Sequence, residues 1–133
     1  MKSTNRAIEC PCGLGGTYLS CCGKYIEQGG NPQTAERLMR SRYCAYVFGR
    51  EDYLLRTWHA STRPSEVTLH NAASIKWLGL KILASQCGES QEAQAHVEFV
   101  ACYAVNGKAE RLHETSRFIL EAGQWFYVYG DLH

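Results

Sequence analysis

Four cysteines near the start of the chain, arranged as two close pairs, are the residues best suited to chemistry. One proline separates Cys10 from Cys12, and Cys21 and Cys22 follow after eight further residues. Four thiolates complete a tetrahedral shell for Zn²⁺, and a shell with no free position is typical of structural rather than catalytic zinc. The spacing therefore predicts one structural zinc ion bound by Cys10, Cys12, Cys21 and Cys22.

Disulfide pairing and redox chemistry are the alternative uses of these thiols, and both stay open at this point. The chain has seven cysteines, and its first residues lead into no apolar run that would signal export. An odd cysteine count without an export signal favours metal binding in the reducing cytoplasm. In the redox alternative, the adjacent Cys21 and Cys22 are released from zinc on oxidation. The remaining thiols are interpreted as small packing residues: Cys44, Cys87 and Cys102.

Length and charge limit the classes of protein and of partner. With 133 residues, the chain has room for one compact domain and a small appendage. Fourteen basic and thirteen acidic residues leave a formal net charge of +1, so nucleic acid is not an expected partner. No apolar stretch is long enough to span a bilayer, so we expect a cytoplasmic protein without membrane segments.

The first half of the chain is predicted to form a metal-binding loop, residues 10–23, followed by two helices. Glycines between the cysteine pairs let the chain double back, and residues 28–32 form a linker rich in helix breakers. Apolar residues at three- and four-residue spacing predict a helix from an N-cap at Thr34 to a stop at Gly49. A shorter helix is expected over Glu51–Trp58, and residues 60–74 are left unassigned.

The second half changes to the two-residue period of β-strands. Strands are expected over Trp77–Leu83, Ala93–Ala104, Lys108–Leu120 and Gln124–Tyr129, joined as a four-stranded antiparallel meander with a turn at residues 88–90. Asn106-Gly107 is a strong hairpin signal. Counting outward from it places Phe99 opposite Glu114 and Val97 opposite Ser116 on the apolar face, with His96, Val100, His113 and Arg117 on a solvent face.

Glu114 is the candidate site residue of this half, because a carboxylate on an apolar face needs a partner. We interpret it first as a group satisfied by the longer helix, through Arg42 or Tyr43. If the carboxylate instead lines a cavity, the candidate pocket residues are Tyr43, Trp58, His59 and Glu114.

The cysteine segment resembles the SEC-C motif, a short zinc-binding module best known from the C-terminal end of the export motor SecA, where it contacts a chaperone. The shared features are the Cys10-Pro11-Cys12-Gly13 opening, the glycine two residues later, Tyr18, and the Cys21-Cys22-Gly23 close. Cys22 stands where many members have histidine. Leu14-Gly15-Gly16-Thr17 stands where such motifs often carry Ser-Gly-Lys-Lys.

Most of the chain, from Cys10 to about Gly130, resembles the YchJ family of bacterial proteins. The resemblance rests on the runs Leu38–Tyr46, Thr57–His59, Glu114–Phe118 and Gly123–Tyr127. It implies an α+β chain: a SEC-C-like zinc knuckle over residues 1–28, then a cone-shaped domain over residues 29–133 that is similar to nuclear transport factor 2 (NTF2), with helices packed on a curved antiparallel sheet.

Two functions remain open at this stage. The first is a zinc-binding protein-interaction or small-ligand-binding module, in which the knuckle presents a surface to a protein partner and a homodimer forms through the open sheet face. The second is an enzyme of the lyase, isomerase or hydrolase type acting on a small molecule in the cone. Because one fold serves both uses, fold alone does not choose between them.

Overall fold

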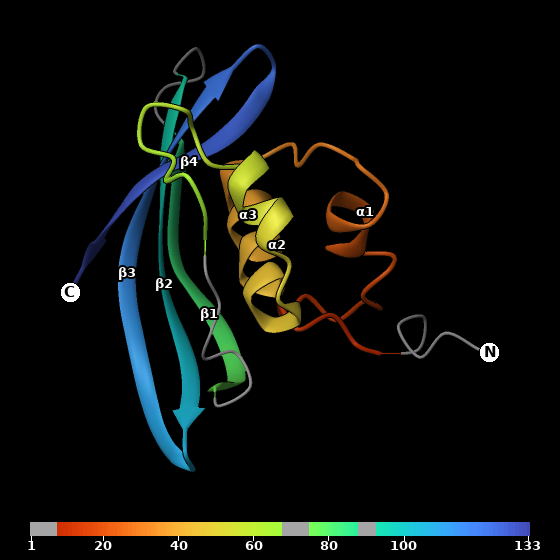
Figure 1. Ribbon diagram of the computed structural model, residues 1–133, viewed down its shortest axis with the longest axis vertical. Helices are drawn as coiled ribbons and strands as arrows, with labels where there is room; N and C mark the ends of the chain where they lie inside the picture. Colours follow the sequence, from red (N-terminus) through yellow and green to blue (C-terminus); the bar gives the residue numbers. More distant parts are fainter. Residues whose placement is uncertain (1–7, 68–74, 88–92) are drawn as a thin grey trace.

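The computed structural model describes residues 8–67, 75–87 and 93–133. The elements follow the order α1 (Gly23–Ile26), α2 (Ala35–Phe48), α3 (Glu51–Arg56), β1 (Ile75–Cys87), β2 (Gln94–Val105), β3 (Lys108–Glu121) and β4 (Gln124–Leu132). Figure 1 shows α2 and α3 against one side of the sheet, with α1 and the cysteine loop beyond α2. The chain is therefore α+β, as its sequence predicts.

The ends of α2 lie where the sequence places them. The side chain of Thr34 accepts a hydrogen bond from the backbone N–H of Arg37 at 3.1 Å, which satisfies a free donor of the first turn. Gly49 adopts a left-handed conformation with φ 72° and ends the helix. The predicted pair of Glu36 and Arg40 on the polar side is also present, with Nε and Oε2 2.9 Å apart.

Helix α3 ends at Arg56, two residues before the predicted end, because the chain turns to join the sheet. The backbone N–H of Tyr127 donates to the carbonyl of Thr57 at 2.9 Å, and the N–H of His59 donates to the carbonyl of Tyr127 at 2.7 Å. These bonds attach the end of the helical layer to β4, and they direct the N–H of His59 and the carbonyl of Thr57 to the strand instead of to a further helical turn.

The four strands form the predicted antiparallel meander in the order β1-β2-β3-β4. The register around Asn106-Gly107 is confirmed, since Val105 pairs with Lys108, Phe99 with Glu114 and Val97 with Ser116. Strands β1 and β4 extend beyond the predicted Leu83 and Tyr129. Their additional residues, among them Ser85, Gln86, Gly130 and Asp131, show no apolar alternation, so pairing with the neighbouring strand makes them strands. The turn predicted at residues 88–90 lies outside the described residues.

One continuous core lies between the helices and the sheet. It combines buried residues of β2 and β3, such as Val97 and Phe118, with Leu38, Leu54 and, beyond the helices, Tyr18 of the cysteine loop. On the outer face, His96, His113 and Arg117 are partly or fully exposed, but the prediction that Val100 faces solvent is wrong, because Val100 is only 5% exposed. It lies in register between Lys81 and His113, whose larger side chains flank it.

Among the helices of the described residues, none is both long enough and apolar enough to cross a membrane.

Candidate metal centre

The four predicted ligands lie together in the interior. Cys10, Cys12, Cys21 and Cys22 are 2%, 0%, 6% and 2% exposed, and their sulfur atoms all lie within 4.8 Å of one another. The Sγ atoms of Cys12 and Cys21 are 3.6 Å apart. A tetrahedral zinc site with Zn–S bonds of about 2.3 Å requires sulfurs about 3.8 Å apart. The cluster can therefore hold a metal ion.

A tight loop brings the first pair of cysteines to the second. Gly13 and Gly15 have φ values of 88° and 100°, a backbone conformation that other residues rarely adopt. The chain returns on itself so that the N–H of Cys10 donates to the carbonyl of Gly16 at 2.8 Å. Within the loop, backbone N–H groups of Cys12 and Leu14 interact with the sulfurs of Cys10 and Cys12. These dipoles favour thiolate, which is the form that binds metal.

The acidities of the thiols show that the cluster does not favour four negative charges by itself. Hydrogen bonds from Cys10, Cys22 and Cys44 hold the pKa of Cys12 far below its ordinary value. Hydrogen bonding to Cys10 and Cys12 raises the pKa of Cys22, and burial raises the pKa of Cys21 to about 11. The pKa of Cys10 is also lowered, to about 6, because the opposing effect of Cys12 is outweighed by hydrogen bonds with Cys22 and Cys44. Thiolate is thus favoured at Cys10 and Cys12 at the cost of Cys21 and Cys22. A dication would replace the protons that the other thiols retain.

A fifth thiol, Cys44 of α2, lies against the cluster. Its Sγ is 3.6 Å from that of Cys10, and its side chain is fully buried. Sequence reasoning interpreted it only as a packing residue, because its 34-residue separation from Cys10 gives no local signal. Cys44 lies outside the group of four mutually close sulfurs, so the tetrahedral set remains the predicted one. Its contact joins the cluster directly to α2.

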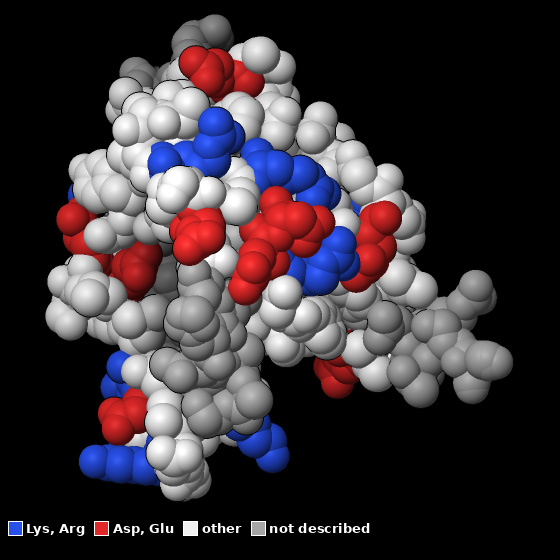
Figure 2. All heavy atoms as spheres, viewed as in Figure 1, with Lys and Arg blue, Asp and Glu red and all other residues white. Residues whose placement is uncertain are grey.

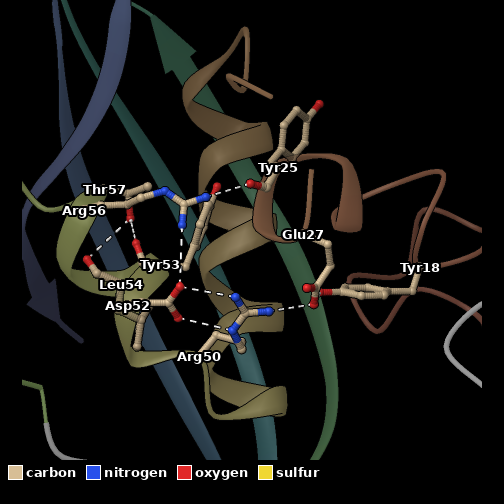
Figure 3. Close-up of polar contacts among 9 residues, drawn as sticks. All are labelled: Tyr18, Tyr25, Glu27, Arg50, Asp52, Tyr53, Leu54, Arg56 and Thr57. Atoms are coloured by element: carbon tan, nitrogen blue, oxygen red, sulfur yellow. Dashed lines mark hydrogen bonds and ion pairs between the residues drawn. The ribbon is translucent and has the colours of Figure 1, made fainter. Parts of the chain in front are cut away.

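Three arginines tie the cysteine segment to the helical layer. Arg40 Nη1 donates to the carbonyl of Cys12 at 2.7 Å, Arg56 Nη2 to the carbonyl of Tyr25 at 2.9 Å, and Arg50 Nη1 to Oε2 of Glu27 at 2.7 Å. Figure 3 shows Arg50 and Arg56 reaching from α3 and its start toward α1. These long-range contacts were not predicted, since no local spacing indicates them and only the pair of Arg40 with Glu36 was expected.

The ion pairs continue around Arg50. Hydrogen bonds from Arg50 hold the pKa of Asp52 below its usual value, and Asp52 and Glu27 in turn raise the pKa of Arg50. Tyr18 donates its hydroxyl to Glu27 at 2.9 Å, while its ring packs edge-on against Phe48 with centroids 4.8 Å apart. Tyr18 is therefore a buried anchor of the cysteine loop. Figure 2 shows acidic and basic side chains interleaved over this part of the surface.

Gly23 closes the cysteine loop, residues 10–23, and we expect Gly23→Ala to disturb it. A Cβ at this position would lie 2.7 Å from the backbone carbonyl oxygen of Tyr18, which has little freedom to move because it accepts bonds from Cys21 and Gly23. The expected loss is about 1–3 kcal/mol in the free energy of unfolding, together with faster release of metal to a chelator. Gly16→Ala is the matched control, because its Cβ meets only the Ser20 hydroxyl at 3.4 Å. Equal effects of the two substitutions would contradict this account of Gly23.

The four candidate pocket residues occupy different surroundings. Tyr43 contacts the Trp77 ring of β1, with centroids 5.6 Å apart. His59 lies near the last hairpin, where Nδ1 is 2.7 Å from the Ser61 hydroxyl and Nε2 is 3.0 Å from Oε1 of Glu121. Trp58 and Glu114 have other neighbours, described next. No hydrogen bond, ion pair or ring contact within the described part of the chain joins the side chains of two of the four directly.

Arg42 is buried, with only 4% of its surface exposed. Its guanidinium lies over two rings, 4.3 Å from the centroid of Tyr127 and 5.1 Å from that of Trp58. Nη1 donates to the carbonyl of Leu54 at 2.9 Å and to the hydroxyl of Thr57 at 2.7 Å. Burial lowers the pKa of Arg42, against the opposing effect of nearby tyrosines and Glu114.

Glu114 is not paired in the way the sequence suggested. Among the described residues, no carboxylate lies within ion-pair distance of Arg42, because the guanidinium is held by the end of α3 and by the two rings. Tyr43 likewise contacts Trp77 rather than Glu114. Glu114 Oε2 instead accepts a hydrogen bond from the hydroxyl of Ser116 at 2.8 Å. Sequence reasoning missed Ser116 as the partner, although both residues were placed on the same face.

The Glu114 side chain occupies the space beside Gly130 that a larger residue would fill. A Cβ at this position would collide with the carboxylate of Glu114. We therefore expect Gly130→Ala to displace Glu114 and to lower the free energy of unfolding, measured in urea, by about 1–3 kcal/mol. Adding Glu114→Ala should reverse part of that loss. Gly79→Ala in β1 has open space around its Cβ and serves as the control. Additive effects of Gly130→Ala and Glu114→Ala would argue against a direct collision.

Comparison with known proteins identifies the family. The family model described as the YchJ middle, NTF2-like domain matches residues 34–130. The chain belongs to the YchJ family. It is 52% identical over 133 residues to a UPF0225 protein of Chromobacterium violaceum, covering 98% of both chains. A UPF0225 protein of Bordetella pertussis is 49% identical over the same length, again with 98% of both chains covered.

Two solved structures share the fold of this YchJ family member. The solution structure of a SEC-C motif containing protein from Rhodopseudomonas palustris has a TM-score of 0.82 and 30% identity, covering 93% of this chain and 98% of that one. A crystal structure of a SEC-C motif containing protein from Psychrobacter arcticus has a TM-score of 0.80 at 24% identity, covering 95% and 83%. These comparisons confirm an NTF2-like α+β fold that carries an N-terminal cysteine knuckle.

Proposed function

We propose that the four-cysteine cluster binds one structural Zn²⁺ and that the chain is a cytoplasmic protein-interaction module built around it. The observation that carries the proposal is the burial of four thiols whose sulfurs all lie within 4.8 Å of one another, close enough to bind one ion. Such a shell leaves no position for a substrate, so the metal would stabilise rather than catalyse. The similarity to SEC-C proteins supports zinc as the ion. A cytoplasmic location agrees with the need for reduced thiols.

The metal loop also holds an apolar side chain in solvent. Leu14 lies between the two cysteine pairs and is 44% exposed. Because the loop is fixed by glycine turns, by Arg40 and, in this proposal, by zinc, Leu14 would be presented in one defined position. A rigid exposed leucine is a suitable contact for an apolar pocket on a protein partner.

A capture experiment tests the interaction role. The zinc-loaded chain is immobilised and exposed to lysate, beside Leu14→Glu and the Cys10/Cys12/Cys21/Cys22→Ser variant. We expect specifically captured proteins to be lost with both variants. Leu83→Glu is the matched control, because Leu83 is 43% exposed but belongs to β1 and not to the loop between the cysteine pairs. Capture that is unchanged by Leu14→Glu and by loss of the four thiols would count against this role.

A second candidate function is the binding or conversion of a small molecule in the cone, as an enzyme of the lyase, isomerase or hydrolase type. Arg42 favours this second function, since a buried guanidinium without an ion-pair partner among the described residues can bind an anionic group. Thermal-shift screening with small organic acids tests this candidate. A stabilising acid whose effect changes in Glu114→Gln would support it, and the absence of any stabilising acid would weigh against it.

Homodimer formation through the outer face of the sheet remains a separate proposal. Leu78 and Tyr129 supply exposed apolar surface on β1 and β4. Light scattering over a range of concentrations gives the mass directly, and a mass of one chain at all concentrations would rule the dimer out.

A further inference from the structure

A second cluster of metal-ligating side chains lies far from the cysteines, on the other face of the sheet. It consists of Glu98 of β2, His113 of β3 and His133, which directly follows β4. We propose that Glu98, His113 and His133 form a surface site for a divalent transition-metal ion such as Zn²⁺, independent of the cysteine cluster.

The strand register brings the three residues to one place. Val100 pairs with His113 and Glu98 pairs with Thr115, so Glu98 lies diagonally across from His113 on the same face. The backbone N–H of His133 donates to the carbonyl of His113 at 2.9 Å, which places the two histidines side by side. Figure 1 shows the C-terminal end of β4 on the side of the sheet away from α2 and α3.

The side chains already converge. His113 Nε2 is 2.7 Å from Glu98 Oε2, and the imidazoles of His113 and His133 are stacked, with centroids 4.1 Å apart and planes inclined by 16°. One ligand atom from each of the three residues lies within 4.8 Å of the other two. Little rearrangement is needed to direct these atoms at a common ion. Pre-placed ligands lower the ordering cost of binding.

The donor set selects the class of metal. Two imidazoles and one carboxylate are suited to Zn²⁺, Ni²⁺, Cu²⁺ or Co²⁺ and poorly suited to Ca²⁺ or Mg²⁺, which favour oxygen ligands. Glu98 and His113 are each about one-third exposed, and His133 is exposed, so water can complete the coordination shell. On the same face, the positive charge of Arg117 is engaged by Asp131, with Nη2 and Oδ2 3.5 Å apart. Because Arg117 is paired with Asp131, the negative charge of the Glu98 carboxylate remains available to the ion.

Local hydrogen bonds hold the ligands without blocking the site. His133 Nε2 is 2.8 Å from the hydroxyl of Thr115, a weak competitor for a metal ion. The bond between Glu98 and His113 would be exchanged for two bonds to the metal. The alternative is that Glu98 and His113 only form this hydrogen bond and bind no metal. Titration with a metal ion distinguishes the two cases.

Titration of the zinc-loaded full chain, purified without a polyhistidine tag, with Ni²⁺ tests the proposal. We expect one equivalent of Ni²⁺ to bind while the zinc content stays constant, and we expect paramagnetic broadening of the ring signals of His113 and His133 in NMR spectra. His113→Asn and His133→Asn should each weaken binding at least about tenfold. His133→Asn changes a residue outside the strands, so its effect on binding does not depend on folding of the sheet.

His96→Asn is the matched control, because His96 lies on the same face of β2 but outside the cluster. Binding should be unchanged in this variant. Failure of the wild-type chain to take up Ni²⁺, or uptake that survives both His113→Asn and His133→Asn, would overturn the proposal and leave Glu98 and His113 as a hydrogen-bonded pair only.

Discussion

Removal of the metal from the cysteine cluster is expected to lower the free energy of unfolding by about 5 kcal/mol or more, since structural zinc contributes about 10–16 kcal/mol in small zinc-binding peptides. The reason lies in the core. The four thiols belong to the same buried cluster as Leu38 and Leu54 of the helical layer, so any thiolate charge left there without a metal ion is not stabilised by solvent. Urea unfolding of zinc-loaded and chelator-treated protein measures the difference.

Hydrogen exchange should show which segment unfolds first when the metal is removed. Amides of residues 8–28 should lose protection first, while the paired amides of β2 and β3 should retain it. The Cys10/Cys12/Cys21/Cys22→Ser variant should behave as the chelated protein does. Cys102→Ser, on β2 and partly exposed, is the control for loss of a thiol. A chelated protein no less stable than Cys102→Ser would contradict a structural role for the metal.

Replacement of Arg42 should have the next largest effect. Arg42→Met is expected to lower the free energy of unfolding by about 3 kcal/mol, because it removes both Nη1 hydrogen bonds and leaves the buried carbonyl of Leu54 without this donor. The contacts of the guanidinium with Trp58 and Tyr127 are lost as well. Denaturant unfolding monitored by tryptophan fluorescence measures the change.

Two further substitutions show whether the geometry or the charge of the Arg42 guanidinium stabilises the fold. Arg42→Lys keeps the positive charge but not the planar fork, so we expect a smaller loss than with methionine. Arg37→Met on the exposed side of α2 should change stability by no more than about 0.5 kcal/mol. If Arg42→Met and Arg37→Met were equally stable, the guanidinium would have no structural role between α3 and β4.

Local signals in the sequence predicted the elements well. The ends of α2 at Thr34 and Gly49 were predictable because capping needs only a side-chain oxygen at one end and a left-handed glycine at the other. The register from Asn106-Gly107 followed from the two-residue turn, which fixes every later pair. The closeness of the four thiols was predictable for a similar reason, since a short loop holds all of them and chain geometry limits how far apart they can lie.

Features that depend on distant contacts were not predictable. The early end of α3 depends on β4, and the burial of Val100 depends on its two neighbouring strands. Cys44 reaches the cysteine cluster only because α2 packs against the metal loop. The sequence suggested Arg42 or Tyr43 as the partner of Glu114, because it does not show that Leu54 and Thr57 offer the guanidinium closer acceptors.

X-ray absorption at the zinc edge, on protein purified with its native metal, tests the central claim most directly. The account predicts one zinc per chain in a shell of four sulfurs at about 2.3 Å, with no oxygen or nitrogen ligand. Zinc with a mixed shell, another metal in its place, or protein that folds fully with no metal would contradict a closed structural site at Cys10, Cys12, Cys21 and Cys22.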